Sequence, residues 1–179
     1  MIGLATKLFG TICKIPDKVM KALSWALFAA YLLILLWLVL FKLSYDPFAV
    51  IRDYQTRSLN LIPFAYSRNT EMIANLVVFI PFGVMLGVNF KQVAWTYKIA
   101  IIFAFSVALE IIQYCLAIGA TDITDVIMNT FGGSFGLAFY IAFSKRTNDG
   151  FLDRCILLAG TLILLAILYL RVFVFIVRY

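Results

Sequence analysis

Polar side chains that could do chemistry gather in one otherwise apolar stretch of the chain, residues 106–136. The main ones are two amides and three carboxylates: Gln113, Asn129, Glu110, Asp122 and Asp125. Carboxylates can exchange protons or hold a divalent cation, and amides can donate and accept hydrogen bonds. Because hydrocarbon surroundings make an unpartnered polar group costly, such residues in such a stretch predict a functional site.

One polar stripe is predicted on the helix that carries Glu110. Ser106, Glu110 and Gln113 are spaced i, i+4 and i+7, so they fall within an arc of about 60°. Glu110 lies well inside the apolar run, where a bare carboxylate costs at least about 2–3 kcal/mol. We therefore expect Glu110 to face the bundle interior, to pair with another group or to be protonated.

A second polar face is predicted on the following helix, within an arc of about 100°. It combines acids, an amide and glycines: Asp122, Asp125, Asn129, Gly132, Gly133 and Gly136. Glycines four residues apart let another helix approach closely. Since the connection before Asp122 is short, we expect the two helices to be antiparallel neighbours, with this face packed against the stripe of Glu110.

Two interpretations of Asp122 and Asp125 stay open at this point. They could be a helix N-cap and a first-turn acid, or they could be candidate ligands of a divalent cation. The polar residues could also serve only to clamp the two helices together. No cofactor is otherwise expected. The chain has no histidine, which excludes Ser/His and Cys/His catalysis and histidine zinc sites.

The whole chain has the composition of an integral membrane protein. Of its 179 residues, 64% are hydrophobic and 13% charged, and the mean hydropathy is +1.02; soluble domains have about 45–50% apolar and about 25% charged residues. We predict an all-α, polytopic membrane bundle (residues 23–179), preceded by a basic amphipathic interfacial helix (residues 1–22). Five transmembrane spans are expected: 23–43, 72–90, 97–118, 123–143 and 155–177.

The formal net charge of +6 comes from lysines and arginines near the ends of the spans. This placement indicates contact with anionic head groups rather than nucleic acid, and a multi-pass protein whose N-terminus is cytoplasmic. The connection 44–71 is then external. Its arginines, Arg52, Arg57 and Arg68, could contact solvent and head groups or bind an anionic ligand. In the next span, Pro81 and Gly83 predict a kink or a break.

Four motifs in order make residues 58–140 resemble the VanZ-like family of bacterial membrane proteins. They are Asn60-Leu61-Ile62-Pro63-Phe64, Asn75 with Phe79-Ile80-Pro81-Phe82-Gly83, Glu110-x-x-Gln113, and Asp122-x-x-Asp125-x-x-x-Asn129-Thr130-x-Gly132-Gly133. Family members often carry an arginine shortly before the first paired aspartate, where this chain has Gly119-Ala120-Thr121. The resemblance implies a role in low-level resistance to teicoplanin, a lipidated glycopeptide antibiotic.

The residues and the resemblance together suggest a non-enzymatic protein of the bacterial cell membrane. Its expected partners are membrane lipids and a lipoglycopeptide or lipid-linked cell-wall precursor, and a homo-oligomer remains open. The expected ligand-binding residues are Asn60, Arg68, Asn75, Ser106, Glu110, Gln113, Asp125 and Asn129. The expected structural residues are Pro63, Pro81, Gly83, Gly132, Gly133 and Gly136.

Two other function classes fit the same residues. The first is a metal-assisted hydrolase or transferase acting on a lipid phosphate, with catalytic candidates Glu110, Asp122 and Asp125. The second is a small transporter, for which an intramembrane carboxylate is also suitable.

Overall fold

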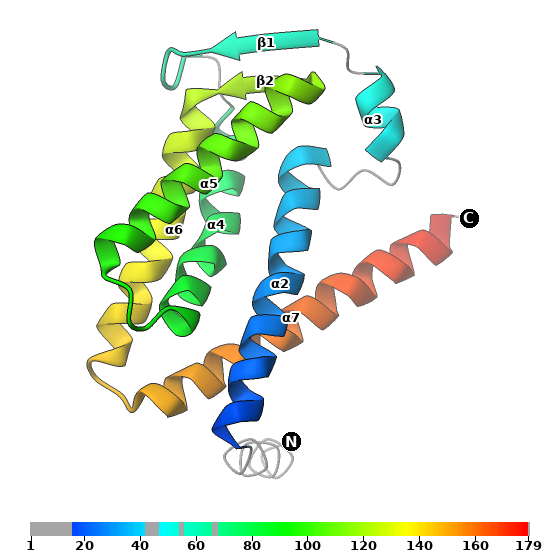
Figure 1. Ribbon diagram of the computed structural model, residues 1–179. Helices are drawn as coiled ribbons and strands as arrows, with labels where there is room; N and C mark the ends of the chain where they lie inside the picture. Colours follow the sequence, from blue (N-terminus) through cyan, green and yellow to red (C-terminus); the bar gives the residue numbers. More distant parts are fainter. Residues whose placement is uncertain (1–15, 42–46, 54–55, 66–67, 179) are drawn as a thin grey trace. The chain divides into compact units, whose positions relative to one another are not determined.

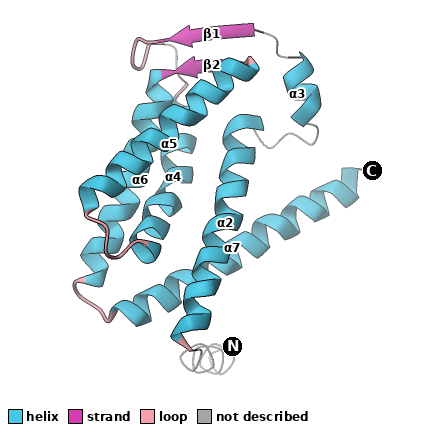
Figure 2. Cartoon of the chain, in the orientation of Figure 1, coloured by secondary structure: helices cyan, strands magenta, loops and turns pink. Residues whose placement is uncertain are grey.

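The computed structural model describes residues 16–41, 47–53, 56–65 and 68–178. Residues 1–15 of the expected interfacial helix lie outside the described residues, as do parts of the connection 44–71. The described chain is almost entirely helical, with one pair of short strands (Figure 2).

Six helices are present among the described residues: α2 (Asp17–Phe41), α3 (Pro47–Asp53), α4 (Asn69–Asn89), α5 (Trp95–Leu116), α6 (Ile123–Ser144) and α7 (Asp149–Arg178). All except the short α3 are long and apolar enough to cross a membrane. This confirms the predicted all-α, polytopic bundle with five membrane-spanning helices. The connection 44–71 is more ordered than a simple loop, because it contains both α3 and a strand.

The chain divides into two compact units. One unit combines the described residues up to Tyr31 with those from Ala142 onward, so it contains the first half of α2 and all of α7. The other unit covers Leu32–Ile141 and contains the second half of α2, α3, α4, α5 and most of α6. All the expected ligand-binding residues belong to this second unit.

Within the second unit, α4, α5 and α6 lie side by side (Figure 1). Glycines bring α4 and α6 into backbone contact, because a Cβ atom on Gly132 or Gly136 would overlap the main chain of α4 at Leu76 or Ile80. We expected the glycine face of α6 to pack against α5. Only Gly133 does so, with the side chain of Ile102 2.6 Å from where its Cβ would lie. The glycine face of α6 therefore packs mainly against α4, which the sequence did not indicate.

The proline of α4 does not break the helix. The helix continues from Asn69 to Asn89 with Pro81 inside it, and the side chain of Pro81 is exposed. Two residues later, Gly83 lets the carbonyl oxygen of Gly133 occupy the space that a side chain would fill. Pro81 and Gly83 thus serve opposite faces of α4, one turned outward and one packed against α6.

Two short strands pair in parallel at one end of this helix group (Figure 1). They are β1 (Thr56–Asn60) and β2 (Ile118–Asp122), and the register sets Asn60 opposite Asp122. Parallel strands need a long crossover connection, which here consists of α4 and α5. Only a short connection, and no strand, was expected before Asp122, so this pairing is a correction.

The backbone contact between α4 and α6 leads to a first prediction. In Gly136→Ala the new methyl group overlaps the Ile80 carbonyl, so the two helices must separate. Overpacking of this kind costs about 1–3 kcal/mol. We expect a lower Tm for the purified protein in detergent. Gly150→Ala is the control, since the nearest atom to its Cβ, the Asn148 Oδ1, lies 3.4 Å away. Equal melting of both variants would contradict the contact.

Candidate functional site

The predicted polar residues meet where α5 ends and α6 begins. α5 ends at Ala117 in the left-handed conformation, with a φ of 53°, and the chain passes through β2 directly into α6. This short path brings the backbone N–H of Asp122 to the carboxylate of Glu110, which accepts its hydrogen bond at 2.9 Å. We call the following residues the α5–α6 cluster: Ser106, Glu110, Gln113, Asp122, Asp125 and Asn129.

Glu110 is turned into the protein and its side chain is almost fully buried. Besides the bond from Asp122, the main-chain carbonyl of Glu110 accepts a 3.3 Å bond from the hydroxyl of Thr121. Asp122 and Asp125 both lie near enough to act on the Glu110 carboxylate electrostatically. The cluster is therefore rich in acidic groups, and Glu110 relies on the β2 backbone for a partner.

Asp122 has a clear structural role as the N-cap of α6. Its Oδ1 accepts a 2.8 Å bond from the backbone N–H of Thr124, and its Oδ2 accepts a 3.1 Å bond from the amide of Asn60. This agrees with the helix-cap interpretation. Both carboxylate oxygens are engaged, so Asp122 could hold a cation only by sharing or losing these bonds.

The turn after β1 is attached to the start of α6. The Asn60 Oδ1 accepts a 3.1 Å bond from the N–H of Ile62, and the N–H of Phe64 donates to the Thr124 Oγ1 at 3.0 Å. Phe64 has a left-handed φ of 62°, and Thr124 is completely buried. Thr124 was not among the predicted site residues. The feature that could have identified it is a small hydroxyl residue two positions after the capping aspartate.

A second contact lies farther along the two helices. The Asn129 side-chain amide donates to the Ser106 Oγ at 3.0 Å, and both residues are completely buried. This contact brings the polar stripe of α5 and the polar face of α6 together. It lies about one helical turn deeper than Glu110, since Ser106 precedes Glu110 by four residues.

Gln113 does not join this pair. Its side-chain amide instead donates to the carbonyl oxygen of Val39 in the second half of α2, at 3.0 Å. None of the residues that we expected to bind a ligand lies in the first span, so the contribution of α2 is a correction. An amide can reach a carbonyl of any neighbouring helix, and the spacing of residues does not indicate which helix that would be.

Several buried acceptor atoms lack a hydrogen-bond partner in the described part of the chain: the Gln113 Oε1, the Asn129 Oδ1 and the Thr130 Oγ1. Two of them belong to the α5–α6 cluster. A buried acceptor without a donor costs about 1–3 kcal/mol. These oxygens are thus suited to a donor supplied by a bound molecule or by water.

A guanidinium group from β1 lies near the cluster end of α5. Arg57 is opposite Gly119 in the strand register, and its Cζ is 5.8 Å from the ring centroid of Tyr114. Residues 119–121 carry no arginine of their own. Strand pairing therefore supplies a cation beside this position from a distant part of the chain.

The other expected residues lie outside the hydrogen-bonded part of the cluster. Arg68 is exposed at the start of α4 and forms a 2.8 Å ion pair with Glu71. Asn75 is half-buried in α4, and Pro63 is exposed in the turn after β1. The described hydrogen bonds join none of them to Glu110. Among the described residues, no group of three or more His, Cys, Asp and Glu is placed to hold a metal ion.

Comparison with known proteins identifies relatives of the chain. The family described as VanZ/LLP1 matches residues 28–144. The chain is 50% identical to "Protein VanZ" of Enterococcus faecium over 152 residues, which is 84% of this chain and 94% of that protein. No solved structure is significantly similar to it.

The double role of Asp122 leads to a second prediction. Asp122→Ala removes the acceptor for Thr124 and the acceptor for Asn60. Loss of an N-cap costs about 0.5–2 kcal/mol. We expect faster hydrogen–deuterium exchange at the first turn of α6 and in β1. Asp122→Asn is the control, because it keeps an oxygen that can cap the helix. Unchanged exchange in Asp122→Ala would show that the cap does not stabilise this end.

The buried pair of Ser106 and Asn129 leads to a third prediction. Ser106→Ala leaves the Asn129 amide without its acceptor, at a cost of about 1–3 kcal/mol. The double variant Ser106→Ala/Asn129→Leu removes both polar groups, so we expect it to lose less stability than the sum of the two single variants. Thermal unfolding in detergent measures all three. Strictly additive losses would argue against a direct bond.

Proposed function

The chain belongs to the VanZ/LLP1 family, and we propose that it lowers the susceptibility of bacteria to lipoglycopeptide antibiotics of the teicoplanin type. In this proposal the α5–α6 cluster binds the polar part of an amphiphile, either the antibiotic or a lipid-linked cell-wall precursor. The family membership and the similarity to "Protein VanZ" support the general role. The details below rest on the geometry of the cluster.

The observation that carries the proposal is the pair of unpartnered buried oxygens, the Gln113 Oε1 and the Asn129 Oδ1. Each side-chain amide already uses its N–H group on the protein, with Val39 and Ser106 as acceptors. The amides are therefore held with their oxygens available to a donor. Glycopeptides and saccharide-linked precursors are rich in hydroxyl and amide donors, which match such acceptors.

An apolar surface beside the cluster supports an amphiphilic ligand. The end of β1 and the turn after it expose large hydrophobic side chains: Leu59, Leu61, Ile62 and Phe64. This turn is attached to the start of α6 through the bond from Phe64 to Thr124. An acyl chain could lie against the turn while its polar group meets the cluster, in keeping with the apolar lining that is usual for ligand sites.

The proposal places the cluster at the outer face of the cell membrane. Within the second unit, the turn between α4 and α5 carries Lys91 and lies at the end of these helices away from β1 and β2. The positive-inside tendency favours a cytoplasmic location for the turn that carries Lys91. The cluster would then meet antibiotic and precursor where both are present.

The proposal needs no catalytic step. The Glu110 carboxylate accepts a bond from the β2 backbone and Asp122 caps α6, so both acids have structural partners. Binding alone could lower the concentration of free drug near its target or shield the precursor from it. Neither effect requires the protein to change its ligand covalently.

The proposed function is tested by expressing the chain in a teicoplanin-susceptible Gram-positive host. We expect the parent to raise the minimum inhibitory concentration of teicoplanin more than that of a glycopeptide without an acyl chain. The double variant Ser106→Ala/Asn129→Leu removes the Asn129 acceptor and leaves neither residue of the pair with an unpaired polar group. We expect it to return susceptibility to the level of the empty host.

Cys115→Ser, on an exposed position of α5, is the matched control and should protect as well as the parent. Membrane amounts of all variants are compared by immunoblot, so that lost protection is not confused with lost protein. Full protection by the double variant at parental amounts would overturn the proposed role of the cluster.

A further inference from the structure

An apolar groove runs between the first half of α2 and α7, entirely within the first unit. Its volume is about 400 Å³, within the range of about 300–1,000 Å³ that is usual for ligand pockets. None of its lining residues belongs to the α5–α6 cluster. They are, apart from Arg154 and Thr161, apolar: Met20, Leu23, Ala26, Leu27, Ala30, Leu157, Leu158 and Leu164.

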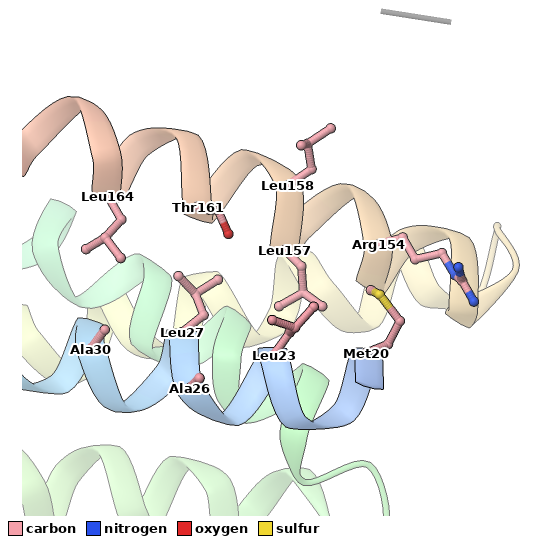
Figure 3. Close-up of a pocket in the computed structure, with 10 residues that line it drawn as sticks. All are labelled: Met20, Leu23, Ala26, Leu27, Ala30, Arg154, Leu157, Leu158, Thr161 and Leu164. Atoms are coloured by element: carbon pink, nitrogen blue, oxygen red, sulfur yellow. The ribbon is translucent and has the colours of Figure 1, made fainter. Parts of the chain in front are cut away.

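The two helices run in the same direction along the groove (Figure 3). Figure 3 shows Arg154 beside Met20 at one end, and Leu164 across from Ala30 at the other. The ten residue-to-residue steps from Arg154 to Leu164 rise by about 15 Å, half the roughly 30 Å thickness of the hydrocarbon core. The length of the groove therefore equals about the hydrocarbon thickness of one leaflet. One end of the groove is charged and the other is apolar.

The charged end adjoins a second hollow with a more polar lining. Arg154 and Asp17 belong to it, together with Thr147, Asn148, Gly150 and Phe151. The Arg154 Nη2 donates to the Asp17 Oδ1 at 3.2 Å, and the Arg154 side chain is only 16% exposed whereas that of Asp17 is 100% exposed. An ion pair with a fully exposed partner contributes little, so another anion can replace Asp17 readily.

Basic residues outnumber acidic ones around the start of α2 and the start of α7. Besides Arg154, the first unit carries Lys18, Lys21, Lys145 and Arg146 there, against Asp17, Asp149 and Asp153. A guanidinium group matches the oxygens of a phosphate, with two parallel hydrogen bonds available. Basic residues at the end of a membrane-spanning segment also attract anionic lipids.

We propose that this groove is a binding site for an anionic phospholipid of the membrane. One acyl chain lies between α2 and α7, and the phosphate binds Arg154 in place of the Asp17 carboxylate. The apolar lining excludes water and favours hydrocarbon, while the partly buried guanidinium selects a head group with net negative charge. The site differs in residues and in ligand from the α5–α6 cluster, and it does not depend on the proposed resistance function.

Native mass spectrometry of the full chain in detergent tests the proposal. The protein is incubated with phosphatidylglycerol or with phosphatidylcholine of the same acyl chains, and the bound lipid is counted. We expect the parent to retain phosphatidylglycerol preferentially. Arg154→Gln should lower this retention about fivefold, as expected for one basic group near an anionic surface. Lys91→Gln removes the same charge from an exposed position of the second unit and should leave retention close to that of the parent.

A variant at an exposed residue keeps the test independent of folding. Asp17→Asn removes the competing carboxylate without touching a buried group, so phosphatidylglycerol retention should rise. Ala30→Phe fills the hydrocarbon end and should lower the retention of both lipids. Equal retention by Arg154→Gln and Lys91→Gln, or equal binding of the two lipids by the parent, would overturn the proposal.

Discussion

The bond between the Asp122 backbone and the Glu110 carboxylate is the constraint on which the rest of the second unit depends. A carboxylate within an apolar helix must find a donor, and Glu110 finds one in a strand rather than in another side chain. The strand must therefore hold its N–H at a fixed place. It does so because β1 pairs with it and because Asp122 caps α6 at the same residue.

The helices are held together by a different kind of contact. Where α4 and α6 meet, glycines replace side chains, and main-chain atoms take up the space. Membrane helices gain little from the hydrophobic effect on one another, so close packing and interhelical polar bonds provide much of their association. In this protein the two kinds of contact lie mostly on different helices: Gly132 and Gly136 pack α6 against α4, and the bond from Asn129 to Ser106 joins α6 to α5.

Sequence reasoning predicted the parts of this fold that depend on local patterns. The spans follow from the lengths of apolar runs, and the burial of Glu110 follows from the cost of exposing a carboxylate to hydrocarbon. The cap at Asp122 follows from its position before a helix. The partners across space were harder to predict. Gln113 meets a backbone carbonyl of α2, and Gly132 faces α4. The spacing of residues along the chain indicates neither of these interaction partners.

The same reason explains why the strands were missed. Each has five residues, and the partner of Asn60 lies 62 positions further along the chain. No alternation of polar and apolar residues distinguishes Ile118–Asp122 from a turn, and Gly119 has a φ of 147°. Such a strand pair depends on the arrangement of the helices around it. It can therefore be predicted only when that arrangement is known.

The parallel pairing of β1 and β2 also has a consequence for biogenesis. The ribosome makes β1 first, and β1 has no partner until α4, α5 and β2 have been synthesised. Because exactly two spanning helices separate the strands, both strands reach the same side of the bilayer only after an even number of crossings. A nascent chain in which α4 or α5 failed to insert would leave the strands on opposite sides. Pairing of the two strands thus depends on correct insertion of the helices between them. It occurs late because the loop that the pairing closes is long.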